Sequence, residues 1–456
     1  MRSIETVADA AIAGPTGSAT GLFFAADGAV VYDWSVDRAR DGILPLAPLI
    51  FPDAVIPLQF LTLEAAIPGK VQFSGKAYFF SGTAYQRVLW TSPPGKDAEG
   101  GLSLDAWHLP APFSGGVDAG FNGLFSREGK GYFFRGPQYL RYDWAADRVD
   151  PSYPRPIGTL VGMPSDFAHG IDAAIDGGGA FERFGYLFRR EDYLRFDWAP
   201  DGGEPHVDGV SRPIRGTWPG LVELLMASRA RSQAMRWIAA TISSLDAFRA
   251  FLSGAGAPSN RVTIELALQA HFRIPATMDP ARLGPLLVQI ASTYAQVVDV
   301  FTRAETTVRF SSAEDEIAHG FFEVDDAGNP VLVDGRRQPL RIGAFGSFGG
   351  QLSVTESFPD RGPMCRAAML VHEAVHVVDD QSGTPATHIS EWYVSTPALA
   401  ASLGLTFQAD RPAEFATRYD LQATADALHN SSSYAAFAAH VHDNADQRFG
   451  DGKPDL

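Results

Sequence analysis

Four short motifs that repeat at a near-constant interval constrain the fold of this chain more than any other feature. An acidic residue followed by two small residues occurs at Asp9, Glu64, Asp118 and Asp172. A tryptophan follows later in each unit, at Trp34, Trp90, Trp144 and Trp198. Both sets keep an interval of about 54 residues, which indicates four copies of one structural unit.

Aromatic runs lie between the two markers of each unit. The third copy reads GYFF at residues 131–134 and YLRYDW at 139–144, and the fourth copy repeats this pattern at 185–188 and 193–198. Aromatic runs broken by Gly, Pro and Asp are typical of short antiparallel strands. Four small sheets that bury their faces against one another predict a four-bladed β-propeller over residues 1–219.

The residues of these units resemble hemopexin repeats. The matching motifs are Asp-Ala-Ala, Tyr-Phe-Phe-x-Gly-x-x-Tyr-x-Arg-Tyr-Asp and the run at 153–157, YPRPI. The resemblance covers roughly residues 1–218 and is strongest in the third and fourth units. It implies a recognition or docking module for a protein, a glycan or a small ligand. The ring-closing disulfide of that family is absent, because the region has no cysteine, so we expect closure by packing and strand pairing between the first and last blades.

The same resemblance implies a central channel near the four acidic residues that open the units. Such channels commonly hold an ion (Ca²⁺, Na⁺ or Cl⁻) on backbone carbonyls. The alternative for Asp9, Glu64, Asp118 and Asp172 is that their carboxylates cap the inner strands through local hydrogen bonds.

The second half of the chain contains the zinc-binding pattern H-E-x-x-H, formed by His372, Glu373 and His376. Apolar residues around it recur at steps of three and four, as on one face of a helix. Residues four apart on a helix stand above one another, so both imidazoles can reach one Zn²⁺ ion. Glu373 then lies beside the metal, where a carboxylate can take a proton from a water molecule.

A catalytic zinc usually has three protein ligands, so the third must come from elsewhere in the chain. Glu391 lies after the helix-breaking Gly383 and Pro385, and we predict it as the third ligand. The alternatives are His388, Glu414, Asp420 and Asp410. Tyr419 is the predicted donor to the developing oxyanion, with Tyr434 and Tyr393 as competitors that are by default packed tyrosines. Cys365, seven residues before His372, is expected to be a small core residue.

The run that begins at Asn430, NSSSYAAF, resembles the terminal segment of the aspzincins, which are deuterolysin-like and peptidyl-lysine zinc endopeptidases. The resemblance covers roughly residues 260–442. Aspzincins also carry Gly-Thr-x-x-Asp, whose aspartate is the third zinc ligand. Here Gly383 and Thr384 match, but Thr387 occupies the aspartate position. This departure favours Glu391 as the ligand.

The rest of this half reads as mainly helical scaffold. Helices are predicted over residues 221–252, 263–272 and 280–305, with Asp279 as the cap of the third. A hairpin is expected over 320–333. Residues 352–357 are predicted to be either an edge strand that receives the substrate backbone or part of a structural hairpin. His429, His440 and His442 are expected at the surface or in helix caps.

Composition limits the classes of partner. The net charge of −16 argues against nucleic acid or anionic membrane, since both require basic surfaces. The single cysteine rules out an intrachain disulfide. No apolar run is long enough to span a bilayer, and no secretory signal is seen at the start. The expectation is a soluble protein of undefined location, with export by a signal-independent route left open.

These observations predict a zinc-dependent endopeptidase in which residues 220–456 form a mainly helical, zincin-like domain. The propeller would dock a substrate or partner, and the substrate would be a protein or peptide. Two alternatives remain at this point. The chain is a non-enzymatic binding protein whose zinc module is structural or inactive, or it is a toxin or effector protease with one host target.

Overall fold

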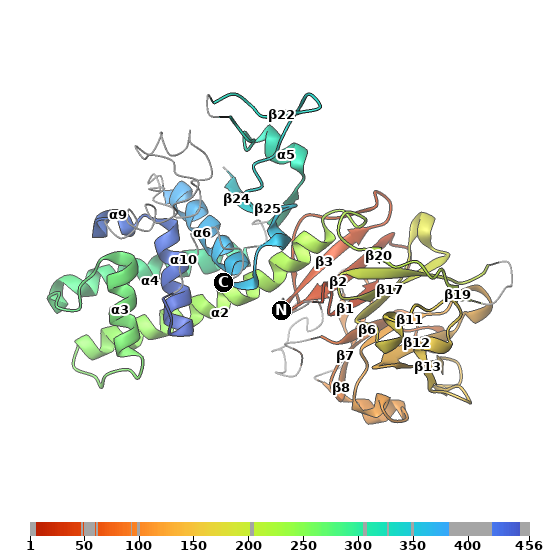
Figure 1. The fold of residues 1–456 in the computed structure, drawn as a ribbon. Helices are drawn as coiled ribbons and strands as arrows, with labels where there is room; N and C mark the ends of the chain where they lie inside the picture. The colour runs from red at the N-terminus through yellow and green to blue at the C-terminus, as the bar shows by residue number, and fades with distance from the viewer. Residues whose placement is uncertain are drawn as a thin grey trace. The chain divides into compact units, whose positions relative to one another are not determined.

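The chain forms two compact units, Met1–Ser228 and Arg229–Leu456. The computed structural model describes residues 6–46, 49, 60, 63–92, 94–97, 101–200, 205–303, 308–325, 328–347, 351–382 and 422–446. The first unit is built from strands and the second mainly from helices (Figure 1). Within the described residues, no helix combines the length and the apolar character needed to cross a bilayer.

The first unit contains four antiparallel sheets of five strands each, one for every sequence repeat. Sheet 1 consists of β1 (Ala10–Ala13), β2 (Thr20–Ala25), β3 (Gly28–Asp33), β4 (Arg38–Ala39) and β5 (Leu44–Pro45). Sheet 2 consists of β6 (Ala65–Pro68), β7 (Lys76–Ser81), β8 (Ala84–Leu89), β9 (Gly95–Lys96) and β10 (Leu102–Ser103). Sheet 3 consists of β11 (Ala119–Asn122), β12 (Lys130–Arg135), β13 (Gln138–Asp143), β14 (Arg148–Val149) and β15 (Arg155–Pro156). Sheet 4 consists of β16 (Ala173–Asp176), β17 (Phe184–Arg189), β18 (Asp192–Asp197), β19 (His206–Val207) and β20 (Arg212–Pro213).

The first strands of the four sheets lie next to one another in a closed ring. Strand β1 neighbours β6 and β16, and β11 neighbours the same two strands. Each first strand begins directly after the acidic residue that opens its repeat. The sequence markers therefore coincide with the innermost strand of every sheet.

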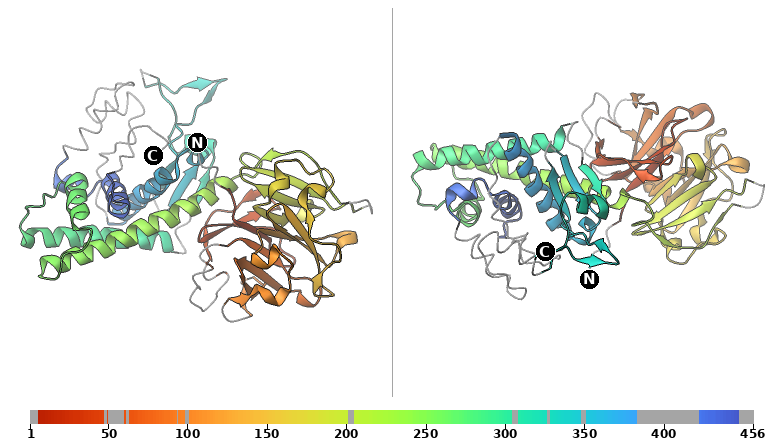
Figure 2. Two further views of the ribbon diagram at one scale, coloured as in Figure 1. Left: turned by 60° about the horizontal axis from the view of Figure 1, so that its bottom comes forward. Right: turned by 90° about the horizontal axis from the view of Figure 1, so that it is seen from above.

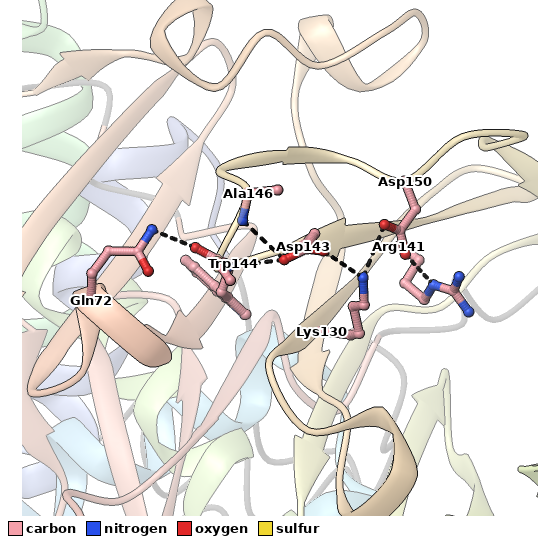
Figure 3. Close-up of polar contacts among 8 residues, drawn as sticks. Gln72, Lys130, Arg141, Asp143, Trp144, Ala146 and Asp150 are labelled. Atoms are coloured by element: carbon pink, nitrogen blue, oxygen red, sulfur yellow. Dashed lines mark hydrogen bonds and ion pairs between the residues drawn. The ribbon is translucent and has the colours of Figure 1, made fainter.

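Each repeat tryptophan packs against the preceding sheet and so joins neighbouring sheets. Trp198 contacts Phe121 of sheet 3, with ring centroids 5.0 Å apart, and Trp34 stacks on Tyr186 of sheet 4 at 5.5 Å. The carbonyl of Trp144 accepts a 2.6 Å hydrogen bond from Nε2 of Gln72, which lies in a short 3₁₀ helix between β6 and β7 (Figure 3). Large aromatic side chains bury much area and favour offset-stacked and tilted contacts such as these.

An ion-pair network lies at the outer end of sheet 3 (Figure 3). Lys130 Nζ is 2.7 Å from Asp143 Oδ2 and 3.0 Å from Asp150 Oδ1. Arg141 Nε donates to the other oxygen of Asp150 at 2.5 Å. These pairs tie β12, β13 and the segment after β14 together through side chains as well as backbone.

Two further tryptophans fill corresponding positions at the boundaries, or seams, between sheets. Trp107, which ends a short 3₁₀ helix (Leu104–Trp107), lies between sheets 2 and 3, and Trp218 lies between sheets 4 and 1. Around Trp107, with ring centroids 4.9–5.8 Å away, are Tyr78, Phe80, Tyr85, Phe133, Tyr142 and Trp144. Around Trp218, at 4.8–5.6 Å, are the repeat equivalents Tyr186, Phe188, Tyr193, Phe23, Tyr32 and Trp34.

Closure of the ring between sheets 4 and 1 uses packing and backbone hydrogen bonds outside the sheets, among them one of 2.9 Å from Ala39 N to Pro219 O. Phe23 and Phe188 meet with centroids 5.4 Å apart, and Val7 N donates to Arg190 O at 3.2 Å. The predicted packing between the first and last repeats is confirmed at this seam. The predicted strand pairing is not found there, since among the described strands those of sheets 1 and 4 pair only within their own sheet.

The described helices are α2 (Leu221–Leu252), which begins in the first unit and continues into the second, and α3 (Arg261–Phe272), α4 (Pro280–Thr302), α5 (Ala313–Ala318), α6 (Pro363–Ser382), α9 (Thr424–Ala427) and α10 (Ser431–Asp443). Helix α10 lies against both α6 and α3, and α4 also packs on α6 (Figure 2). The predicted cap of α4 is present, because Asp279 Oδ1 accepts a hydrogen bond from Ala281 N at 2.8 Å.

A three-stranded sheet precedes α6. Its order is β21 (Val308–Ser311), β25 (Gln351–Thr355) and β24 (Ala344–Ser347), with β25 parallel to β21 and antiparallel to β24. The prediction that residues 352–357 form an edge strand is therefore wrong, since β25 is the central strand. The hairpin predicted over 320–333 is present in part, as an antiparallel bridge between Val324 and Pro330. A separate hairpin follows it, with β22 (Leu332–Val333) paired to β23 (Arg336–Arg337).

Candidate metal centre

Helix α6 carries the H-E-x-x-H residues in the interior of the second unit. His372 is fully buried, Glu373 is 3% exposed and His376 is half-buried. The Nε2 atoms of His372 and His376 lie 3.0 Å apart. Their rings meet at 74° with centroids separated by 4.7 Å. The helical spacing thus brings two imidazole nitrogens to one point.

The first turn of α10 faces these two histidines. Ser431 Oγ lies 3.2 Å from His372 Nε2 and 3.0 Å from His376 Nε2. Ser432 Oγ lies 3.2 Å from the other ring nitrogen of His372, Nδ1. A hydrogen bond at Nδ1 fixes which nitrogen carries the proton and how the ring is oriented. The motif at Asn430 does not by itself predict these contacts from the two serine hydroxyls to the histidine rings.

Asn430 holds that first turn in place. Its side-chain oxygen accepts a hydrogen bond from Ser432 N at 3.3 Å, as an N-cap residue does. Its Nδ2 donates to Gln422 Oε1 at 3.0 Å and to Ser433 Oγ at 3.3 Å. All of these residues are buried. A buried polar network with its partners in place fixes one arrangement of the serines relative to α6.

The carboxylate of Glu373 is anchored by the sheet. Gly346 N, in β24, donates a 2.7 Å hydrogen bond to Glu373 Oε2. One carboxylate oxygen is therefore held by the backbone of the strand that lies against α6. Such an anchor orients a general base before any substrate arrives.

The converging imidazoles fit one zinc ion. Zinc bound tetrahedrally at 2.0–2.1 Å places neighbouring ligand atoms roughly 3.3–3.4 Å apart, close to the 3.0 Å between the two Nε2 atoms. In the described part of the chain, no third His, Cys, Asp or Glu approaches both nitrogens within 4.8 Å. Cys365, also on α6, belongs to no such cluster of described residues, and burial raises the pKa of its thiol.

The other predicted site residues divide into two groups. The first group lies outside the described residues and consists of Glu391, Tyr419, His388, Glu414, Asp410, Asp420 and Tyr393. The second group is Tyr434 alone. Tyr434 is described and fully buried, and its hydroxyl donates to Leu428 O at 3.0 Å. Thr293 Oγ1 lies 3.2 Å from the same hydroxyl. Burial raises the pKa of Tyr434, and the expectation of a packed tyrosine is confirmed for it.

The four acidic residues of the first unit make local hydrogen bonds, as one alternative predicted. Each carboxylate accepts a hydrogen bond from a backbone N–H in the turn between the second and third strands of its own sheet. The pairs are Asp9 with Ala26 (2.8 Å), Glu64 with Gly82 (3.0 Å), Asp118 with Gly136 (2.7 Å) and Asp172 with Arg190 (2.6 Å). The acidic marker of each repeat therefore has a structural role.

One histidine departs from the sequence-based expectation. His440, predicted at the surface or in a cap, is 6% exposed and lies against the buried His271 of α3. The prediction failed because the partner is far away in sequence. His442, two residues later on α10, is exposed as expected.

The sequence matches a known family model in the first unit. The hemopexin model matches residues 121–165, which lie in sheet 3 and the segment that follows it. The human protein matrix metalloproteinase-25 is 35% identical over 109 residues, which are 24% of this chain. The chain spans about a fifth of that relative (18%). The N-terminal half therefore contains a hemopexin-like region. Hemopexin regions also occur in metalloproteinases.

Solved structures also show distant similarity to the chain. A hemopexin fold protein, CP4 from cow pea, is 23% identical, with 48% of this chain and 97% of that chain covered at a TM-score of 0.40. A zinc peptidase from Grifola frondosa is 13% identical, with 49% and 96% covered at a TM-score of 0.25. Neither likeness is close enough to carry an argument about function.

Proposed function

We propose that this chain is a zinc-dependent endopeptidase whose hemopexin-like first unit is a four-bladed β-propeller that docks a substrate or partner. The second unit, in this proposal, is a zincin-like domain related to the aspzincins. The observation that carries the proposal is the convergence of His372 Nε2 and His376 Nε2 at 3.0 Å, with the anchored carboxylate of Glu373 between them in sequence. The substrate is a protein or peptide.

His372, His376 and Glu391 are the proposed zinc ligands. Glu391 lies outside the described residues, so its part rests on the sequence. Zinc bound here would polarise a water molecule and the carbonyl of the scissile peptide. The two described ligands are of the right type, since neutral imidazole is a preferred ligand of zinc.

Glu373 is the proposed general base and acid. Its carboxylate accepts a proton from the attacking water and gives a proton to the amine nitrogen as the peptide C–N bond breaks. The hydrogen bond from Gly346 N holds Oε2 and so orients the carboxylate. The carboxylate thus ends the reaction in the state in which it began. Tyr419 is the proposed donor to the carbonyl oxygen as it gains charge.

Ser432 and Asn430 act through His372. Ser432 Oγ at Nδ1 orients the ring, and Asn430 holds Ser432. We assign both residues a positioning role, because neither lies where a substrate atom reacts. The arrangement resembles the hydrogen-bonded second layer that surrounds most histidine–metal sites.

Strand β24 is the proposed docking edge for the substrate backbone. Among the described strands of its sheet it lies at the edge, and Gly346 on it contacts Glu373. A peptide that adds to this edge passes close to the general base. The sequence predicted that residues 352–357 receive the substrate backbone, and we assign this role to the neighbouring strand β24 instead.

The test is Glu373→Gln in the full chain. The amide keeps the size of the side chain but cannot accept the proton, so peptide cleavage should fall by about 10²–10⁴-fold while bound zinc is retained. A peptide-library digest measures cleavage, and mass spectrometry of the metal measures zinc. Retained cleavage by the variant would overturn the assigned role of Glu373.

A non-enzymatic binding protein is the second candidate. It is favoured by one observation, that the family-model match lies entirely in the first unit. In that case the wild-type chain binds zinc without cleaving any member of the peptide library. The same digest therefore separates the two candidates.

A further inference from the structure

Three metal-ligating side chains converge at the other end of α10, away from the α6 pair. His271 Nε2 of α3 lies 3.0 Å from His440 Nδ1 of α10. The same Nε2 lies 3.5 Å from Oδ1 of Asp446, which follows α10. Within the described residues, this is the one group of three or more His, Cys, Asp or Glu whose ligand atoms all lie within 4.8 Å of one another.

The burial of this cluster is uneven. His271 is fully buried and His440 is 6% exposed, whereas the side chain of Asp446 is 39% exposed. Two imidazoles in the interior must have partners for their ring nitrogens, because unsatisfied polar atoms are costly there. The exposed carboxylate gives the cluster access to solvent, which an entering ion requires.

The chain after α10 is bent back towards α3. Asn444 ends the helix in the left-handed conformation, with φ of 55°. Its side-chain oxygen accepts a hydrogen bond from Thr263 Oγ1 on α3. This reversal brings Asp446 to His271. The neighbouring carboxylate, Asp443, pairs with His442 at 2.6 Å.

The two separations from His271 Nε2 are compatible with a tetrahedral metal site. Ligands 2.0–2.1 Å from a zinc ion lie roughly 3.3–3.4 Å apart, and the two separations at His271 Nε2 are 3.0 and 3.5 Å. Calcium and magnesium prefer sites made only of oxygen. Two imidazoles and one carboxylate are instead a donor set for zinc and its first-row neighbours.

We propose that His271, His440 and Asp446 form a second metal site that binds a divalent transition ion, most simply Zn²⁺. Water completes the tetrahedron from the exposed side. The site joins α3 to the C-terminal end of α10, and its metal has a structural role.

The proposed site is separate from the α6 pair and does not depend on the proposed peptidase activity. His440 lies nine positions after Ser431 on α10, a distance of about 14 Å along the axis. No ligand is shared. The first turn of α10 nevertheless touches His372 and His376, so a metal at the far end would steady the helix that carries Ser431 and Ser432.

The experiment measures bound zinc in the full chain after removal of metal with a chelator and reloading with Zn²⁺ alone. The variant His372→Asn/His376→Asn removes the α6 pair and should retain one equivalent of zinc. Adding His440→Asn to that variant should remove the remaining zinc. His442→Asn is the matched control on the same helix, and adding it instead should leave the equivalent in place.

A second measurement covers the case in which His440→Asn fails to fold. Asp446→Asn, at a partly exposed position, should lower zinc affinity in the His372→Asn/His376→Asn background by at least tenfold, because one ligand of three loses its charge. Zinc should also raise the melting temperature of that background and not of its Asp446→Asn derivative. The proposal is overturned if the background binds no zinc, or if His440→Asn and Asp446→Asn both bind as much as the His442→Asn control. Loss of peptidase activity in any variant has no bearing on these readouts.

Discussion

Gly346 N donates a 2.7 Å hydrogen bond to Glu373 Oε2, and this contact ties the edge strand β24 to the helix that carries the two converging histidines. The carboxylate is therefore positioned by a backbone N–H group, whose place does not depend on any side-chain rotamer. A substitution that shortens the side chain must give up either this anchor or the reach towards the histidines.

Glu373→Asp tests that dependence on length. The variant keeps the charge but moves the carboxylate back by one methylene group, and misplacement of a catalytic group by about 1 Å commonly costs about 10²-fold in rate. We expect kcat/KM for a peptide substrate to fall by about that factor, with zinc content unchanged. A fall far beyond that factor would contradict a role for placement alone, and unaltered kinetics would contradict the anchor.

Ser432→Ala and Ser431→Ala should affect zinc binding in different ways. Ser432 bonds Nδ1 of His372, a nitrogen that does not face His376, so its loss should weaken zinc binding by about 10–100-fold. Ser431 bonds the two Nε2 atoms that would hold the metal. That contact must yield when zinc binds, so Ser431→Ala should not lower the affinity. Competition with a fluorescent chelator measures both, and equal losses would contradict the assignment of Nε2 as the metal-binding atom.

Trp218→Ala should open the seam between sheets 4 and 1. The side chain is 4% exposed and meets six aromatic rings, so truncation should lower the free energy of unfolding of the first unit by about 3–5 kcal/mol. Urea unfolding followed by far-UV circular dichroism measures this change. Val161→Ala, at a position 63% exposed, is the control and should cost less than about 0.5 kcal/mol. A similar small cost for Trp218→Ala would mean that other contacts close the ring.

Asp176 should make stability depend on pH. Burial raises the pKa of this carboxyl group to about 7, above the value of about 3.9 in an unfolded chain. Between these two values the native state binds more protons than the unfolded state, so stability falls as pH rises from about 4 to about 7 and then levels off. Asp176→Asn removes this penalty and should stabilise the protein by about 2–4 kcal/mol at pH 8, with little change at pH 4.

Asp143→Asn is the control of opposite sign. The hydrogen bond from Lys130 lowers the pKa of Asp143, so its charged form stabilises the native state above the ordinary pKa. The substitution should destabilise the protein at pH 8, and the difference from wild type should vanish as pH falls through the lowered pKa. Urea unfolding at several pH values measures both variants, and an Asp176→Asn curve parallel to that of the wild type would contradict the assignment.

The repeats could be predicted because they depend on local order. An acidic residue, an aromatic strand and a tryptophan recur in register, and each first strand begins directly after its acidic residue. The helix that carries His372 and His376 followed from spacing alone, and so did the convergence of their rings. Trp107 was missed because the segment before it departs from the repeat pattern.

Contacts between distant segments could not be predicted. His440 lies in an alanine-rich run whose pattern does not indicate which face is buried, and its partner His271 is 169 residues away. The central position of β25 depends on β21, a strand that comes before the whole hairpin region. The third zinc ligand, predicted as Glu391, stays a prediction because that residue lies outside the described ranges.

Because Trp107 and Trp218 have matching surroundings, the four sheets of the first unit group into two equivalent pairs. Each tryptophan follows an even-numbered sheet and seals it to the next odd-numbered one. Sheets 1 and 2 with Trp107 therefore form one half, and sheets 3 and 4 with Trp218 form another of the same design. The two halves of this single polypeptide are thus arranged like the two copies in a homodimer. The boundary between sheets 4 and 1 has the same set of aromatic residues as the boundary between sheets 2 and 3 in the middle of the unit.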